Sequence, residues 1–229
     1  QQITTVQMPL ANTVPGPGGG DQEVALDVEA LLATAPKAAQ RVYVAHNDAA
    51  SAIAVYSQIA DDVAAGLIQV VSTSWGRCEA MYSPAFLKQL AAPIDRLVAS
   101  GGTRSAASGD SGADGCADAA VPDGRLAVDF PASLPSVVGV GGTRLTRSGS
   151  GVYAETGWGP SPTTTAGTAF PGRGSGGGTS AVFSRPAYQS SWPPWPRSWR
   201  ECCPLAIGTT STTGRVKDDG HQDDHNPLR

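Results

Sequence analysis

The alternation of apolar and polar positions along the chain predicts a series of helices. Residues 22–33 place acidic and apolar residues at helical spacing, with Asp21 as a plausible N-cap. Residues 49–65 are alanine-rich and amphipathic. Residues 84–100 repeat the helical pattern, with Pro84 near the first turn. We therefore predict three helices within the first hundred residues.

Short apolar segments between and after these helices are typical of strands. Residues 41–45 contain two β-branched valines around a tyrosine, and residues 67–74 form a continuous apolar run that turns polar at its carboxyl end. Three further segments follow the third helix, at 105–112, 128–131 and 137–140. Strands that alternate with helices favour an α/β fold, with a parallel sheet covered by helices on both faces.

In a parallel sheet of this kind, ligands bind outside the carboxyl ends of the strands. Ser74, Trp75 and Gly76 follow one predicted strand, and the Gly-Asp-Ser-Gly segment at 109–112 follows another. We expect any binding site to involve these two strand ends.

The composition excludes some classes of partner. Charged residues make up 16% of the 229 residues and the formal net charge is −4, so there is no electrostatic argument for nucleic acid or for an anionic membrane surface. No apolar run approaches the roughly 18 residues that a membrane helix needs. The chain begins without a signal peptide or an initiator methionine, as if it had been cut from a longer protein.

The cysteines and histidines offer two further sites to consider. Cys78 and Cys116 each follow a predicted strand, and we predict that they pair in an oxidising compartment; two unrelated thiols are the alternative. His221 and His225, in the polar C-terminal region, could hold a metal only loosely, and no spacing matches a zinc site.

Glu23 and Asp27 are the most informative pair of acidic residues. They lie four residues apart in the first predicted helix, so both carboxylates point to the same side of a rigid element. By itself such a pair is often a solvated surface charge. The motifs elsewhere in the chain give it a more specific meaning.

Five segments together resemble the sedolisins, the serine-carboxyl peptidases with a subtilisin-like fold. The resemblance covers residues 19–189, and its segments stand in the family's order. They are Gly-Asp-Gln-Glu-Val-Ala-Leu-Asp-Val-Glu (20–29), Ser-Thr-Ser-Trp-Gly (72–76), Ala-Ser-Gly-Asp-Ser-Gly (107–112), Val-Asp-Phe-Pro-Ala-Ser-Leu-Pro-Ser-Val-Val-Gly-Val-Gly-Gly-Thr (128–143) and Ser-Gly-Gly-Gly-Thr-Ser-Ala-Val-Phe-Ser-Arg-Pro-Ala-Tyr-Gln (175–189).

The resemblance implies a role for each candidate site residue. Glu23 would be the general base, Asp27 would orient it, and Asp110 would contribute to the oxyanion site. Ser74, Trp75 and Gly76 would form the strand edge that binds the substrate backbone. A carboxylate can replace the usual imidazole base if the enzyme works in acid, because a useful base has a pKa near the working pH.

The nucleophile is where the chain departs from the family. The family's serine lies in a Gly-Thr-Ser segment with proline four residues later. Four residues after Ser180 the chain has Ser184, and the proline comes only at residue 186. The segment around Ser180 matches a glycine-rich stretch upstream of the family's serine, so we do not expect Ser180 to be the nucleophile. Arg104 is a second anomaly, since the family has a buried strand at this position.

These observations predict an incomplete, truncated sedolisin-type peptidase domain over residues 1–189 and a disordered non-family segment over 190–229. We expect a secreted, monomeric chain whose partner is a protein or peptide substrate, and which is inactive because the nucleophile segment is missing. No cofactor is expected, since calcium would belong to a complete family member. The alternatives are a non-catalytic peptide-binding or decoy module and an active hydrolase that uses Ser180.

Overall fold

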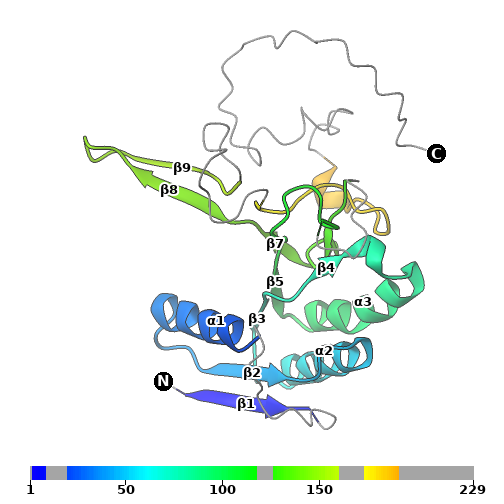
Figure 1. Cartoon of the computed structure of the whole chain (residues 1–229). Coiled ribbons are helices and arrows are strands. Elements are labelled where there is room, and N and C mark those ends of the chain that lie inside the picture. The colour runs from blue at the N-terminus through cyan, green and yellow to red at the C-terminus, as the bar shows by residue number, and fades with distance from the viewer. Residues whose placement is uncertain (1, 9–19, 118–125, 160–172, 191–229) are drawn as a thin grey trace, which may run out of the picture. The chain divides into compact units, whose positions relative to one another are not determined.

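The computed structural model describes residues 2–8, 20–117, 126–159 and 173–190 (Figure 1). The chain folds into two compact units, and each unit consists of three separate segments. The first unit takes in the described residues of Gln1–Gly76, Tyr82–Ala107 and Leu134–Gly139. The second takes in those of Arg77–Met81, Ser108–Ser133 and Val140–Arg229. The predicted extent of the peptidase domain therefore covers parts of both units.

The first unit is an α/β structure with parallel strand pairs. Its elements are β1 (Ile3–Gln7), α1 (Gly20–Thr34), β2 (Gln40–Val44), α2 (Ala49–Ala64), β3 (Val70–Thr73), α3 (Pro84–Ala99), β5 (Thr103–Ala107) and β7 (Val138–Val140), whose last residue belongs to the second unit. Strands β1 and β2 pair in parallel from Ile3↔Gln40 to Gln7↔Val44. Strands β3, β5 and β7 form a second sheet in that order, with β3 and β5 parallel.

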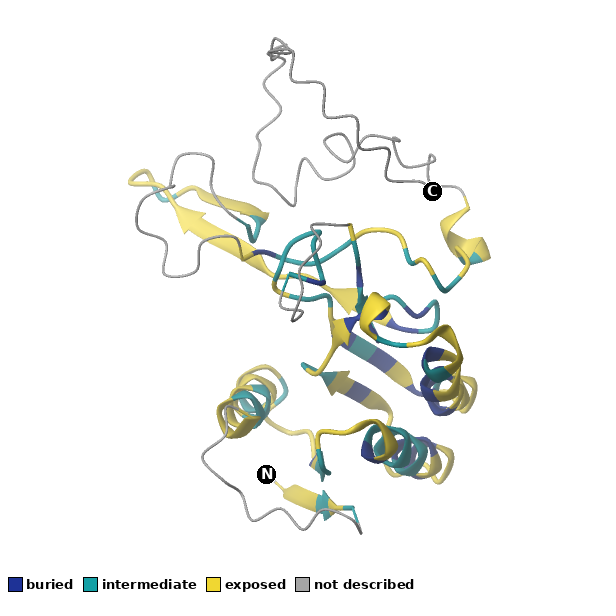
Figure 2. Ribbon diagram, turned by 45° about the vertical axis from the view of Figure 1, so that its right-hand side comes forward, coloured by how far each residue is buried: buried dark blue, intermediate teal, exposed yellow. Residues whose placement is uncertain are grey.

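The helices of this unit begin where the sequence supplies caps. The Asp48 carboxylate accepts a hydrogen bond from the amide of Ser51 at the start of α2. The Ser83 hydroxyl accepts one from the amide of Phe86 at the start of α3, and Pro84 occupies the first turn as predicted. Figures 1 and 2 show α1 on one side of strand β3 and α2 and α3 on the other.

The core of the first unit lies between α2, α3 and the strands. Ile59, Ala60 and Val63 of α2 pack with Val71 of β3 and Leu97 of α3. Figure 2 shows buried positions along α2, α3 and the neighbouring strands. Burial of these side chains provides the main stabilisation of the unit.

Arg104 interrupts this otherwise apolar interior. It lies in β5 opposite Val71 and is 1% exposed, with its guanidinium 4.2 Å from the centre of the Tyr56 ring. The strand forms with Arg104 buried inside it, and none of the guanidinium nitrogens has a hydrogen-bond partner among the described residues, so Arg104 is the anomaly in a buried strand that the sequence indicated. Burial lowers the pKa of Arg104, and Tyr56 opposes that shift.

The second unit is built mainly of loops and short strands. Strand β4 (Arg77–Cys78) pairs antiparallel with β6 (Asp129–Phe130), and the 3₁₀ turn η1 (Glu79–Met81) follows β4 directly. A hairpin forms from β8 (Thr143–Arg147) and β9 (Tyr153–Gly157), and a second 3₁₀ turn, η2, spans Ala187–Gln189.

Three local features differ from the sequence predictions. Strand β1 was not anticipated, and Asp21 lies inside the first turn of α1 instead of capping it, because the helix begins at Gly20. The β8–β9 hairpin was not anticipated either, and its side chains are almost all exposed. The predicted disorder of 190–229 and the two histidines there fall outside the described residues from position 191 on.

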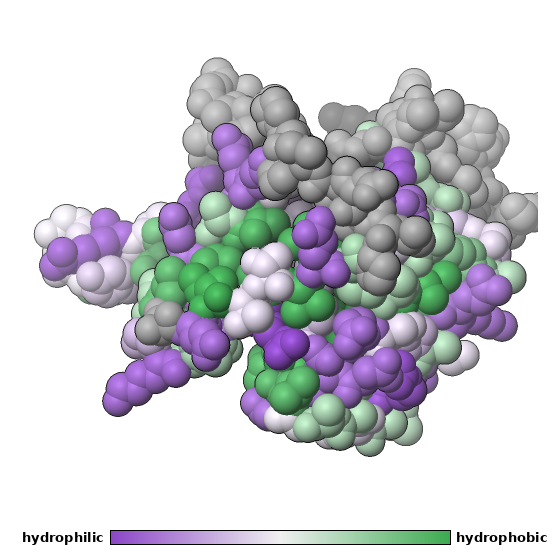
Figure 3. Space-filling model, turned by 90° about the horizontal axis from the view of Figure 1, so that it is seen from below, coloured by the Kyte–Doolittle hydropathy of each residue, from purple (hydrophilic) through white to green (hydrophobic). Residues whose placement is uncertain are grey.

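Several large apolar side chains reach the surface, among them Leu26, Val70 and Leu145. Figure 3 shows such apolar side chains interspersed with polar ones on the face that it draws. None of the helices in the described ranges has both the length and the apolar character that crossing a membrane requires.

Candidate active site

Helix α1 presents the two carboxylates on one side. Glu23 and Asp27 are half-buried, as are Val24 and Val28 next to them, whereas the intervening residues are exposed. This stripe follows from the 3.6-residue helical period. The side-chain amide of Gln40 in β2 donates to the Val28 carbonyl at 3.3 Å, which ties the same part of the helix to the first sheet.

The end of strand β3 meets this face of α1. The Ser74 hydroxyl donates a hydrogen bond to Asp27 Oδ1 at 2.7 Å. The indole of Trp75 lies against Gly20, 4.0 Å from the point where a side chain would begin at that position. The structure thus brings the predicted strand edge, at Ser74–Gly76, to the carboxylate pair of α1.

Asp110 belongs to the second unit. Its carboxylate lies 3.4 Å from Nη1 of Arg173, and both side chains are about half exposed. The glycines on either side of the Asp110–Ser111 pair, Gly109 and Gly112, have positive φ angles of 104° and 62°, which side chains rarely adopt. The convergence of Asp110 with Glu23 and Asp27 in one cleft stays a prediction.

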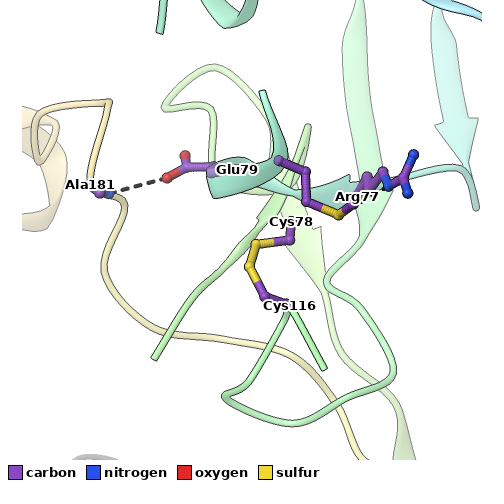
Figure 4. Close-up of a disulfide and its surroundings, with 6 residues drawn as sticks. Arg77, Cys78, Glu79, Cys116 and Ala181 are labelled. Carbon is purple, nitrogen blue, oxygen red and sulfur yellow. Dashed lines mark hydrogen bonds between the residues drawn. A yellow bond between two sulfur atoms is a disulfide. The ribbon is translucent and has the colours of Figure 1, made fainter. Parts of the chain in front are cut away.

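Ser180 has a carboxylate partner of its own. Its hydroxyl donates to Glu79 Oε1 at 2.7 Å and accepts hydrogen bonds from the amides of Val182 and Phe183 at 3.1 and 2.8 Å. The amide of Ala181 donates to Glu79 Oε2 at 3.1 Å (Figure 4). Both lone pairs of the Ser180 oxygen are therefore engaged by backbone donors.

Glu79 is the residue that sequence reasoning missed. It is only 3% exposed, and it holds a segment 101 residues further along the chain. The pattern around Glu79 gives no sign of such a distant partner. Burial of a carboxylate is costly unless hydrogen-bond donors surround it, and here the donors of the 180–181 segment meet that need.

The predicted disulfide is confirmed. Cys78 and Cys116 are bonded, with their Cα atoms 5.2 Å apart (Figure 4). Because Glu79 follows Cys78 directly, η1 is joined to two segments at once, covalently to the loop after Asp110 and by hydrogen bonds to Ser180 and Ala181.

Comparison with proteins of known function agrees with this arrangement. No family model matches the chain. The chain is 36% identical over 192 residues to kumamolisin of Bacillus sp. (strain MN-32). The aligned region covers 82% of the chain and 32% of kumamolisin. It is 32% identical over 178 residues to sedolisin of Pseudomonas sp. (strain 101), and this aligned region covers 75% of the chain and 29% of sedolisin. The chain belongs to the sedolisin family.

A solved structure extends this relationship to the fold. Pseudomonas sedolisin, a serine-carboxyl proteinase complexed with two molecules of pseudo-iodotyrostatin, superposes on this sedolisin homologue with a TM-score of 0.64 and 27% identity. The match covers 84% of this chain and 54% of that one. The chain spans about a third of the length of the curated relatives, and the predicted subtilisin-like α/β fold is confirmed.

The glycine-rich segment of this sedolisin homologue runs alongside the Asp110 loop. Gly174 pairs with Ser111 in a parallel bridge, and its amide donates to the Asp110 carbonyl at 2.7 Å. The amide of Gly176 donates to the Gly109 carbonyl at 2.9 Å. These bonds hold the glycine-rich segment against the loop that carries Asp110.

The described residues do not fit a metal site. Within the ranges that the structure describes, no group of three or more His, Cys, Asp or Glu side chains could hold a metal ion.

Proposed function

We propose that this chain carries part of the active site of a sedolisin-type serine endopeptidase that cleaves proteins or peptides in acid. Glu23 would act as general base and Asp27 would orient it. Asp110 would donate a hydrogen bond to the oxyanion, which requires its carboxyl group to be protonated and hence an acidic medium. In such a reaction a serine hydroxyl attacks the peptide carbonyl while its proton passes to Glu23.

The observation that carries this proposal is the meeting of strand β3 with helix α1. Ser74, at the start of the proposed substrate edge, donates to Asp27, so the edge and the carboxylate pair are held together. A substrate backbone laid along Ser74–Gly76 would then run beside Glu23 and Asp27. The half-buried position of both carboxylates also suits acid–base work better than a fully solvated surface pair would.

We further propose that the described part of the chain supplies no nucleophile. Ser180 is the serine that the sequence offers, yet its hydroxyl is committed to Glu79 and its oxygen already accepts two amide hydrogen bonds. A serine in this state serves to hold a turn. Removal of the nucleophile from a triad leaves only weak residual catalysis, so we expect no measurable turnover.

A peptide-binding or decoy module is the second candidate, and the same bonds of Ser180 favour it. The strand edge would still bind an extended peptide, while the carboxylate pair would serve no reaction. In both cases we propose a secreted, monomeric protein. The Cys78–Cys116 disulfide supports this location because such bonds persist mainly in oxidising compartments.

Two measurements test these proposals. Turnover of a denatured protein is measured between acid and neutral pH for the wild type and for Ser180→Ala. We expect none, and acid turnover that Ser180→Ala abolishes would make Ser180 the nucleophile and contradict the proposal.

Binding of pseudo-iodotyrostatin, the compound in the related sedolisin structure, is then measured by calorimetry in acid. We expect binding that Trp75→Ala weakens and that Asp21→Asn, an exposed acidic control on α1, leaves unchanged. Sensitivity of the affinity to Glu23→Gln favours the peptidase-type cleft, and indifference to it favours the binding module. The absence of any binding would contradict both.

A further inference from the structure

The Ser74 hydroxyl does not serve its own turn. After β3 the chain bends, and the bend is closed by the neighbouring side chain, since the Trp75 amide donates to Thr73 Oγ1 at 3.2 Å. Serine and threonine at such positions usually bond the local backbone. Here Thr73 makes that local contact, and Ser74 reaches across to Asp27, 47 residues earlier in the sequence.

The contact is of a kind that fixes side-chain orientation. A hydroxyl that donates to a carboxylate makes a charge-assisted hydrogen bond, which is stronger than a neutral one. Asp27 has two side-chain torsions, and a bond to one carboxylate oxygen selects one staggered rotamer. Gln40 holds the helix itself through the Val28 carbonyl, so backbone and side chain at this turn of α1 are restrained from two different strands.

We infer that Ser74 is a positioning residue for Asp27, in addition to its place in the proposed substrate edge. It orients the Asp27 carboxylate, and Asp27 in turn orients Glu23. The inference rests on the proposed function for the role of Asp27, but the contact that it concerns lies wholly within the first unit. One consequence is that the strand edge which would hold the substrate also sets the geometry of the carboxylate pair.

The test measures the orientation of Asp27 directly, in the full chain, by three-bond couplings in NMR. In the wild type we expect the couplings of a single Asp27 rotamer. In Ser74→Ala we expect averaged couplings, and Ser74→Thr, which keeps a hydroxyl, should restore the single rotamer. Ser72→Ala is the matched control, because Ser72 is an exposed serine of β3, two residues before Ser74. If Ser74→Ala does not fold, the nearly isosteric Ser74→Cys, a weak donor, takes its place.

The result that would overturn the inference is an Asp27 rotamer unchanged in Ser74→Ala or Ser74→Cys. An effect of equal size in Ser72→Ala would also overturn it, because the change would then reflect a general loosening of β3. Turnover and inhibitor binding do not enter the measurement. A fixed Asp27 rotamer that depends on Ser74 would therefore sustain the inference even if the proposed function failed. An Asp27 rotamer that does not depend on Ser74 would overturn the inference even if the proposed function held.

Discussion

Replacement of Arg104 by methionine should stabilise the protein. Arg104 is 1% exposed, and none of its guanidinium nitrogens has a hydrogen-bond partner among the described residues. Burial lowers the pKa of Arg104, but a guanidinium is effectively always charged in proteins, so the cost of burying the charge remains.

The magnitude follows from two opposing terms. Removal of a charged group from water costs several kcal/mol even after the protein relaxes. The stacking of the guanidinium on Tyr56, at 4.2 Å, returns about 2 kcal/mol when the pair is desolvated. Methionine has a similar length and no charge, so we expect Arg104→Met to raise the free energy of unfolding by about 1–4 kcal/mol.

Thermal and denaturant unfolding would measure this change. For a chain of this size, each kcal/mol corresponds to a shift of roughly 2–4 °C in Tm. Arg144→Met is the control, since Arg144 lies exposed in strand β8 and its loss should change stability by no more than about 0.5 kcal/mol. A loss of stability in Arg104→Met would refute the reasoning.

Three further predictions concern the second unit. Glu79→Ala should destabilise the protein by about 1–3 kcal/mol for each donor left unpaired, and should expose the glycine-rich segment to limited proteolysis; an unchanged cleavage pattern would contradict this. Gly176→Ala should cost about 1–3 kcal/mol in denaturant unfolding, because its new carbon would lie 1.9 Å from a backbone oxygen, whereas Gly177→Ala meets nothing within 4 Å and serves as control. Removal of the Cys78–Cys116 disulfide by a double serine substitution should cost about 2–4 kcal/mol, and an unchanged Tm would show that the crosslink does not stabilise the fold.

The elements that could be predicted from sequence are those whose signal is local. Helices α2 and α3 begin at the predicted residues, because a cap and a periodic apolar face are both written within a few positions. Strand β3 was predicted from an apolar run, which a buried sheet requires, and β5 overlaps the predicted segment at 105–112 in its last three residues. The Cys78–Cys116 bond followed from the neighbouring ends of these strands.

What the sequence could not predict depends on burial or on distant contacts. Strand β1 and the β8–β9 hairpin are largely exposed, so no apolar alternation marks them. Glu79 bonds Ser180, 101 positions away, and Ser74 bonds Asp27, 47 positions away. A single sequence carries no record of such distant pairs. The sequence marked Arg104 as an anomaly in a buried strand, but only the structure shows that its guanidinium lies over the Tyr56 ring.

The division of the chain into two units, each made of three segments, has a consequence for folding and for evolution. The backbone passes from one unit to the other five times between Gly76 and Val140. No single cut can release either unit as a continuous polypeptide, so neither could be inherited or exchanged as a module. Each unit must also close several long loops before its contacts form, which makes folding slow. Unfolding of one unit disturbs the backbone at each point where the chain passes to the other unit.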